Sequence, residues 1–243
     1  MIVLALDTSA AATAALVDGE ELLAERTEFS SRKHVEFMGP ALKELLAAGP
    51  APEAVVVGIG PGPFTGLRAG IAAGTGAALG LGVPLYGVVS HDALALRSLV
   101  DVQPGGRGHD AVPGAATAVG AVPTVVATDA RRKEVYVSAY SGLDADGLPV
   151  RTAGPQVLAP AALAAELPSA AGVRRVGRGF ALYAEMLGAP DLTEVAALEP
   201  TAEWLGRWAG RALAAGRTLP GTEPLYLRDP DAKPADRRAT LLA

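Results

Sequence analysis

The chain has 243 residues, with 21 basic against 26 acidic side chains and no cysteine. This length is ample for a buried core, so the fold needs no disulfide or metal to hold it together. The lack of cysteine excludes a disulfide framework, a cysteine-ligated zinc site and a thiol nucleophile. The formal charge of -5 is unfavourable for a chain that binds nucleic acid on its own, because phosphates require a basic patch.

No stretch of the sequence has the character of a membrane span. The longest weakly charged run, residues 69–89, is interrupted by several glycines and by Pro84. The opening residues 1–7 are apolar without a basic region before them, which is typical of a strand and not of a signal peptide. We therefore expect a soluble, cytoplasmic protein without a membrane partner.

The first hundred residues alternate between strand and helix patterns. Apolar and β-branched runs predict strands at 2–6, 14–17, 21–28, 54–59 and 83–89. Helical spacing predicts three helices: one capped by Ser30 or Ser31, one over 66–81 capped by Thr65, and one over 92–100. Because Pro40 lies inside the first, we expect a kink there or a late helix start. Alternation of this kind favours an α/β layer architecture.

The opening pattern recurs after a loop. Residues 103–123 are rich in Gly, Pro and Ala and predict a surface loop or linker. A strand over 124–128 then ends in Asp129, as the first strand ends in Asp7. Further strands at 135–140 and 174–176 and a helix near 180–187 complete the second copy.

We interpret this recurrence as a duplicated α/β unit, although any α/β chain can contain two strands that end in Asp. The predicted parts are an N-terminal lobe (1–102), the loop (103–123), a C-terminal lobe (124–220) and a tail (221–243). The tail either returns to the first lobe or is disordered.

Two strand ends carry polar groups that suit phosphate chemistry. Asp7, Thr8 and Ser9 place one carboxylate and two hydroxyls at a turn, and Asp129 occupies the matching place in the second copy. In duplicated folds that bind ATP, such turns face each other across a cleft and hold phosphates and a metal ion. The alternative is an Asx turn that only closes a hairpin.

A glycine-rich loop precedes the second helix. Gly60 and Gly62 alternate with Pro61 and Pro63, and the loop matches neither a Walker motif nor a dinucleotide fingerprint. It is either an anion cradle or a rigid turn. In the helix that follows, glycine recurs every four residues, although glycine inside a helix is unfavourable by about 0.5–1 kcal/mol relative to alanine. The repeat predicts close approach by another helix of this chain or by another subunit.

The three histidines do not form a metal motif. His34, His91 and His109 are dispersed, and none has a second histidine three or four residues away. No nucleophile elbow is present either. We therefore predict no catalytic residues, no metal site and no tightly bound cofactor.

Several segments together resemble the TsaB (YeaZ) family, bacterial partner proteins in the synthesis of threonylcarbamoyladenosine at position 37 of tRNA. They are Leu4-Ala-Leu-Asp-Thr-Ser9, Gly60-Pro-Gly-Pro-Phe-Thr-Gly-Leu-Arg68, Gly87-Val-Val-Ser90, Asp129-Ala-Arg-Arg-Lys-Glu-Val-Tyr136 and Tyr226-Leu-Arg228. The resemblance covers residues 1 to about 230. Pro63 stands where the family usually has Ser.

The resemblance implies a two-lobed fold of the actin, Hsp70 and sugar-kinase type and a non-catalytic role beside the paralogue TsaD. TsaD carries a His-x-x-x-His metal pair where this chain has only His91. The implied partners are a TsaD-like paralogue, a TsaE-like ATPase and, for the chain alone, a second copy. ATP and Mg²⁺ enter only through the complex, and tRNA only indirectly. Asp7, Thr8, Ser9, Gly60, Gly62 and Asp129 are implied to be remnants of a nucleotide cleft.

The resemblance also assigns the partner contact to the two early helices. The candidates on the first are His34, Phe37, Met38, Pro40, Leu42, Leu45 and Leu46, and those on the second are Leu67, Arg68, Ala69, Gly70, Ile71, Ala72, Gly74, Thr75, Gly76 and Leu79. We expect Gly70→Leu or Gly74→Leu to block this contact while the monomer stays folded. Rival functions are a stand-alone ATPase or kinase that uses Asp7 and Asp129, and a metallopeptidase.

Overall fold

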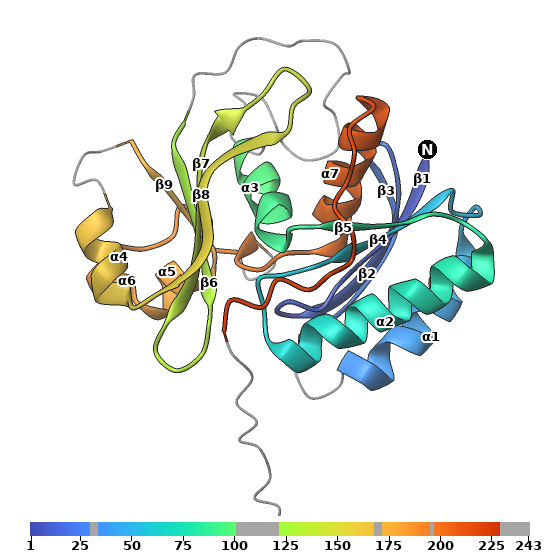
Figure 1. Cartoon of the computed structure of the whole chain (residues 1–243), viewed down its shortest axis with the longest axis horizontal. Helices are drawn as coiled ribbons and strands as arrows, with labels where there is room; N and C mark the ends of the chain where they lie inside the picture. Colours follow the sequence, from blue (N-terminus) through green and yellow to red (C-terminus); the bar gives the residue numbers. More distant parts are fainter. Residues whose placement is uncertain (30–33, 101–121, 168–171, 195–196, 229–243) are drawn as a thin grey trace, which may run out of the picture.

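The computed structural model describes residues 1–29, 34–100, 122–167, 172–194 and 197–228. Within these ranges the chain forms two β-sheets with helices packed on them (Figure 1). The strands are β1 (Ile2–Asp7), β2 (Ala12–Asp18), β3 (Glu21–Glu28), β4 (Ala54–Gly58), β5 (Leu85–Val88), β6 (Thr124–Asp129), β7 (Val135–Leu143), β8 (Pro149–Leu158) and β9 (Arg174–Val176). The helices are α1 (His34–Ala48), α2 (Phe64–Leu81), α3 (Ser90–Val100), α4 (Pro160–Glu166), α5 (Arg178–Leu182), α6 (Ala184–Leu187) and α7 (Ala202–Ala214).

The two sheets repeat one topology. The first has the order β3-β2-β1-β4-β5 and the second the order β8-β7-β6-β9. In the first, β1 pairs antiparallel with β2 and parallel with β4; in the second, β6 pairs antiparallel with β7 and parallel with β9. This correspondence confirms the predicted two-lobed, duplicated α/β fold.

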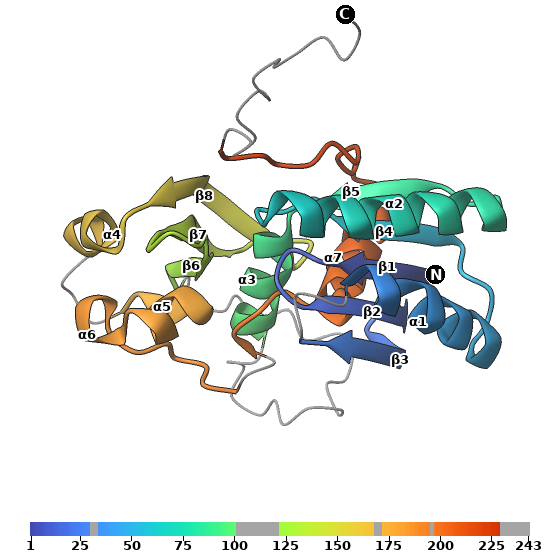
Figure 2. The ribbon, with the colours of Figure 1, turned by 90° about the horizontal axis from the view of Figure 1, so that it is seen from below.

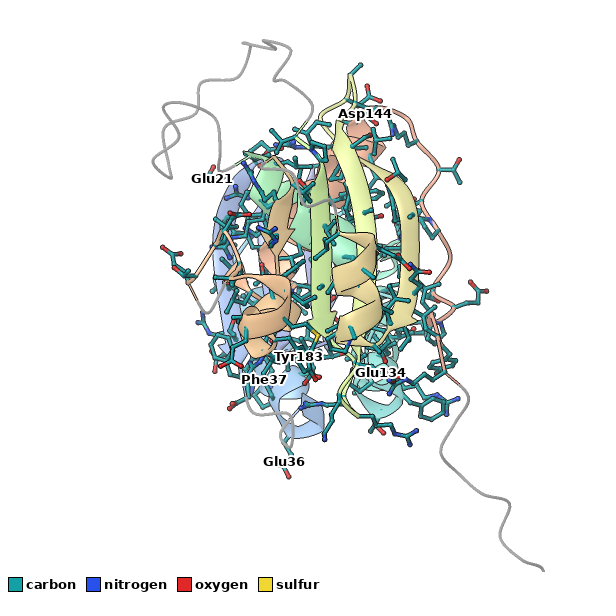
Figure 3. All side chains as sticks on the ribbon, turned by 90° about the vertical axis from the view of Figure 1, so that its left-hand side faces the viewer. Glu21, Glu36, Phe37, Glu134, Asp144 and Tyr183 are labelled. Atoms are coloured by element: carbon teal, nitrogen blue, oxygen red, sulfur yellow. The ribbon has the colours of Figure 1, made fainter. Side chains whose placement is uncertain are left out.

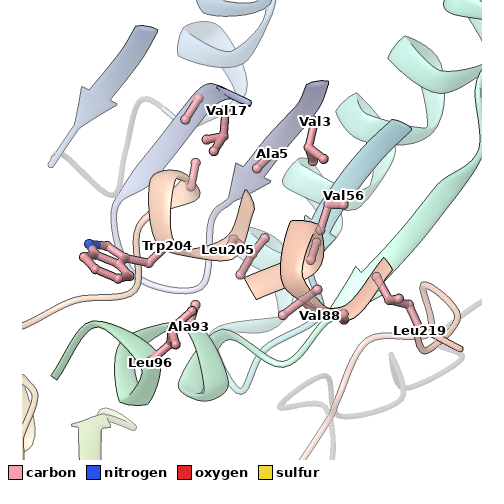
Figure 4. Close-up of a cluster of buried hydrophobic side chains, with 14 of the residues drawn as sticks. Val3, Ala5, Val17, Val56, Val88, Ala93, Leu96, Trp204, Leu205 and Leu219 are labelled. Atoms are coloured by element: carbon pink, nitrogen blue, oxygen red, sulfur yellow. The ribbon is translucent and has the colours of Figure 1, made fainter. Parts of the chain in front are cut away.

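The first sheet is covered on both faces, which explains why β1 is apolar from Ile2 to Leu6 and does not alternate. Leu4 and Leu6 contribute to a cluster with α1 and α2. Val3 and Ala5 point to the other face, where they pack with residues of α7 such as Leu205 (Figure 4). Figure 1 shows α1 and α2 on one side of this sheet and α7 on the other.

Helix α7 brings a late part of the chain onto the first sheet. It lies in the range predicted to form the C-terminal lobe, yet it packs on β1, β2 and α3 of the first lobe. Gly206 makes this possible, since a Cβ there would lie 2.8 Å from Cγ2 of Val17. Neither α7 nor β8 nor α4 was predicted from the sequence. Helix α3 lies between the lobes and contacts β6, β7 and β8 of the second sheet (Figures 1 and 2).

Three details of the predicted helices differ from the structure. Helix α2 begins at Phe64 after Pro63, and no side chain caps it, so the assignment of Thr65 as its cap is wrong. Helix α1 runs through Pro40 from His34 to Ala48. The cap residues proposed for α1 lie outside the described residues. The helix expected near 180–187 is divided at Tyr183 into α5 and α6.

The tail returns to the first lobe as far as the structure describes it. The Gly87 amide donates to the Pro220 carbonyl at 2.9 Å, and the Leu225 amide donates to the Ile59 carbonyl at 2.8 Å. Residues 229–243 and most of the predicted loop, 103–121, lie outside the described residues. Within the described part of the chain, no helix is both long and apolar enough to span a membrane.

Candidate functional site: the cleft between the lobes and the outer face of α2

A cleft of about 570 Å³ opens between the two lobes. On the first-lobe side it is lined by Ser9, Phe29 and the first turn of α2, and on the second-lobe side by Asp129, Arg131, Arg178 and Glu199. The predicted meeting of two strand ends therefore occurs in part, since Ser9 and Asp129 line the same cleft.

Asp7 does not line this cleft. Its carboxyl group is fully buried, with Oδ1 accepting from the Ser9 amide at 2.7 Å and the Ser9 hydroxyl at 2.6 Å. Its Oδ2 accepts from the Ser90 hydroxyl at 2.6 Å. Burial raises the pKa of Asp7, and these hydrogen bonds oppose that shift. The expectation that Asp7 faces Asp129 across a cleft is wrong, because its carboxyl group closes the turn after β1 and holds the start of α3.

Thr8 and the glycines of the loop before α2 also have packing roles. The Thr8 hydroxyl donates to the Gly66 carbonyl at 2.7 Å and accepts from the Gly70 amide at 3.1 Å. Gly62 is buried, and a Cβ there would lie 2.8 Å from Cα of Ser9. The buried loop from Gly60 to Gly62 is therefore a rigid turn that sets the start of α2, and not an open anion cradle.

Of the two predicted strand-end carboxylates, Asp129 is the one that lines the cleft. Its Oδ1 accepts from the Arg131 amide at 2.7 Å, and its Oδ2 lies 3.1 Å from the Arg131 guanidinium. Arg131, Arg132 and Lys133 all have positive φ angles, of 60°, 53° and 61°. For residues with a side chain, the left-handed backbone conformation is unfavourable by roughly 1–2 kcal/mol per residue. Asp129 therefore helps to hold a strained turn at the rim of the cleft.

Glu199 and Arg178 complete the cleft and were missed from the sequence. Oε1 of the buried Glu199 lies 3.3 Å from Nη1 of Arg178. Burial raises the pKa of Glu199 to about 7, while Arg178 opposes the shift. Glu199 stands two residues before the N-cap of α7, which was not predicted, so no local pattern marked it.

His91 is buried at the junction of the lobes. One ring nitrogen lies 2.8 Å from the Ser138 hydroxyl and the other 2.8 Å from the Thr128 hydroxyl. Because a hydroxyl can donate or accept, the neutral ring is satisfied in either tautomer. Burial lowers the pKa of His91 to about 3. His91 thus ties α3 to β6 and β7, and neither nitrogen is available to a metal in this arrangement.

Asp92 makes a second tie between the lobes. Its Oδ1 accepts from the Tyr140 hydroxyl at 2.7 Å and lies 3.6 Å from the Arg151 guanidinium. Burial raises the pKa of both Asp92 and Tyr140. Across the described residues, no group of three or more potential metal-ligand side chains occurs. His109 lies outside those residues, and of His34 only the backbone is described.

The predicted partner helices have an inner and an outer face. Met38, Leu45, Leu67, Gly70 and Gly74 of the predicted contact are buried in the chain's own core. Because they are buried within this chain, they are not on the surface that a partner meets. The rest of that contact stays a prediction.

The glycine repeat of α2 lets the helix pack closely on β4 and on the turn after β1. At Gly74, a Cβ would lie only 2.2 Å from Cγ1 of Val57, and at Gly70 only 2.3 Å from the Thr8 hydroxyl. The close approach is therefore to this chain's own first lobe. Leucine at either glycine should therefore destabilise the monomer itself, so these two variants do not test the partner contact alone.

The outer face of α2 consists of Ala72, Gly76, Leu79 and Gly80, all exposed. The Leu79 side chain is 79% exposed. Apart from the helix's own backbone and the adjacent residues, no atom of the described residues lies within 4 Å of where a Cβ of Gly76 or Gly80 would be. Helix α1 runs beside α2 (Figure 2).

The C-terminal segment links this helix to the second lobe. The Arg68 guanidinium lies 3.8 Å from the Phe64 ring centre and donates to the Tyr226 hydroxyl at 2.7 Å. Arg228 donates to the Ala130 carbonyl at 2.8 Å and forms an ion pair with Glu134. Three of the segments that carried the sequence resemblance therefore meet at one end of the molecule.

Comparison with known proteins identifies the family. The family model described as TsaD, tRNA N6-adenosine threonylcarbamoyltransferase, matches residues 26–168. An uncharacterised protein of Mycobacterium tuberculosis strain H37Rv is 36% identical over 239 residues, covering 96% of this chain and 94% of the relative. The tRNA threonylcarbamoyladenosine biosynthesis protein TsaB of Escherichia coli K12 is 28% identical over 239 residues, covering 94% and 95%.

The solved structure of YeaZ from Pseudomonas aeruginosa is similar to this chain with a TM-score of 0.71 and 30% sequence identity. The match covers 93% of this chain and 99% of that one. Sequence and fold thus agree over nearly the whole chain, which therefore belongs to the TsaB (YeaZ) family.

Proposed function

We propose that this chain is a non-catalytic subunit that pairs with a TsaD-like paralogue for N6-threonylcarbamoylation of adenosine 37 in tRNA. The name of the E. coli relative and the description of the family model support this pathway. In this proposal the chain acts in the cytoplasm, has no cofactor of its own and forms a homodimer when alone. ATP and Mg²⁺ act only in the complex, through a TsaE-like ATPase.

The outer face of α2 is the observation that carries the proposal. Leu79 is 79% exposed, and Gly76 and Gly80 have no side chains that cover the helix backbone on the same side. An exposed leucine does not stabilise the monomer, and two glycines inside a helix destabilise it relative to alanine. A partner helix that packs here would bury Leu79 and approach closely over the glycines.

The state of His91 supports a non-catalytic role. TsaD is expected to use two histidines at this place, whereas here a single imidazole is buried between two hydroxyls. A metal ion would have to displace both hydrogen bonds and still lack a second histidine. The proposal therefore assigns chemistry to the paralogue and positioning to this chain.

Light scattering after size-exclusion chromatography tests the proposal with the chain alone and mixed with its TsaD-like paralogue. We expect a one-to-one complex that replaces any homodimer. Gly76→Arg and Leu79→Glu should each abolish it, because both place a charge on the outer face while the monomer has room for either side chain. Ala161→Glu, on the exposed side of α4, is the control and should leave the complex intact. Wild-type affinity in the two α2 variants would contradict the assignment.

A stand-alone ATPase or kinase is not proposed. Asp7, one of its two required carboxylates, is buried with both oxygens hydrogen bonded. Asp129 is paired with Arg131. Magnesium-dependent ATP binding by the isolated chain, lost in Asp129→Ala, would favour that rival.

A further inference from the structure

The cleft between the lobes has the size and the mixed lining of a site for a small molecule. Its volume of about 570 Å³ lies in the range of ligand pockets, which often occur where two domains meet. The wall formed by the first lobe includes the apolar side chains of Phe29, Pro63 and Ala69, and the wall formed by the second lobe carries Arg178 and Glu199. An apolar wall opposite a few polar groups is the usual composition of a binding site for an organic molecule.

Arg178 is only partly neutralised within the cleft. Its Nη1 lies 3.3 Å from Oε1 of Glu199, and this is the only ion pair of its guanidinium among the described residues. Charge-assisted hydrogen bonds are usually about 2.7–2.9 Å long, and arginine often binds a carboxylate through two parallel bonds. Arg211 binds Glu20 in this way, at 2.7 and 2.9 Å. The side chain of Arg178 is 51% exposed, so its guanidinium keeps donors for a ligand.

The carboxyl group of Glu199 is partly protonated at neutral pH. Burial raises its pKa to about 7, with smaller contributions from the carboxylates of Asp129 and Asp7, although Arg178 opposes the shift. In its neutral form this carboxyl group donates a hydrogen bond and leaves the charge of Arg178 uncompensated. Asp129 and Arg131 are the other charged residues in the described part of the lining, and they form an ion pair at 3.1 Å. This lining then has one positive charge in excess.

From the geometry of this cleft we propose that it binds a small organic molecule with one carboxylate group and an apolar body. Arg178 holds the carboxylate, and the carboxyl group of Glu199 donates a hydrogen bond to it. The apolar body packs on Phe29, whose side chain is 57% exposed. A phosphate ester carries more negative charge than Arg178 balances, and the carboxylate of Asp129 opposes it.

Equilibrium dialysis of the full chain tests the proposal with three matched probes, naphthylacetate, the neutral naphthylacetamide and naphthyl phosphate. We expect the carboxylate to bind roughly tenfold more tightly than the amide or the phosphate. Arg178→Gln should weaken binding of the carboxylate by a similar factor. Phe29→Ala should weaken it severalfold, and because the side chain is exposed this variant should keep the fold.

A matched control removes an arginine far from the cleft. Arg217 pairs with Asp144 at 2.8 Å. Figure 3 shows Asp144 at the opposite end of the second sheet from Glu134, which belongs to the same turn as the cleft residue Arg131. Arg217→Gln should therefore bind naphthylacetate with wild-type affinity.

The pH dependence of binding separates the role of Glu199 from that of Arg178. The probe stays ionised at pH 6 and pH 8, whereas Glu199 loses its proton between them and then repels the carboxylate. Wild type should bind naphthylacetate about tenfold more tightly at pH 6 than at pH 8. Glu199→Gln never ionises and should bind it equally at both. Arg178, Asp129, Arg131 and Asp7, which surround Glu199, are present in both proteins, so a dependence that they cause would persist in the variant.

The outcomes decide between a carboxylate site and its rivals. Equal binding of naphthylacetate and naphthylacetamide, or wild-type affinity in Arg178→Gln, overturns the proposal. Tighter binding of naphthyl phosphate also overturns it and assigns the cleft to phosphate esters. If thermal unfolding shows that Arg178→Gln does not fold, Phe29→Ala and the pH series decide. Leu79→Glu lies outside the cleft lining and should keep wild-type probe binding, so failure of the partner contact and failure of this site are separate results.

Discussion

The buried imidazole of His91 predicts a specific loss of stability in acid. Burial lowers its pKa from an ordinary 6.5 to about 3, so the folded protein keeps His91 neutral while the unfolded chain binds a proton below pH 6.5. The stability that this group contributes is complete above pH 6.5 and is lost as the pH falls towards 3. A pH of 5 is 1.5 units below the pKa of the imidazole in the unfolded chain, so the free energy of unfolding falls by about 2 kcal/mol at that pH.

Denaturant unfolding at pH 8 and pH 5 measures this contribution in wild type and in His91→Gln. The free energy of unfolding should fall by about 2 kcal/mol more in wild type than in the variant when the pH is lowered from 8 to 5. Any stability that the variant already loses at pH 8 does not affect this comparison. All other titrating groups are shared, so they cancel in this comparison. If the free energy of unfolding fell equally in the two proteins, His91 would not be a buried, neutral group. A role for this ring in proton transfer or metal binding would then be open again.

Two further predictions concern α2 and the cleft. Gly74→Ala should destabilise the fold by about 1–3 kcal/mol, because its Cβ meets Val57, whereas Gly76→Ala should stabilise it by about 0.5–1 kcal/mol, since its site is open. Thermal unfolding of both variants checks the contrast, and equal effects would contradict the inner and outer faces of α2. The pKa of Glu199 is raised to about 7 in the folded state, so its carboxyl group ionises less readily there than in the unfolded chain. The free energy of unfolding should therefore fall by up to about 3 kcal/mol as the pH rises from 4.5 through 7. Glu199→Gln should remove that fall, and a wild-type pH profile in the variant would argue against it.

The site was only partly predictable. The sequence located the polar strand ends at Asp7 and Asp129, because an apolar run that stops at polar residues is a local pattern. It could not tell that the carboxyl group of Asp7 turns inward to Ser90 while Asp129 faces the cleft. Glu199 had no local signal at all, since its burial and its raised pKa arise from segments distant in the chain.

The sequence by itself determined the order of strands and helices in the first lobe, the duplication and the family. These follow from hydrophobic periodicity and from motifs a few residues long. Only the tertiary structure decided which way each residue of α2 faces. Gly66, Gly70 and Gly74 mark one stripe of the helix and Gly76 lies on another. Spacing alone does not show that Gly70 and Gly74 face Thr8 and Val57 of the first lobe while the site of Gly76 is open. The physical reason is that spacing gives relative positions around a helix, whereas the packing of distant segments chooses the side that is buried.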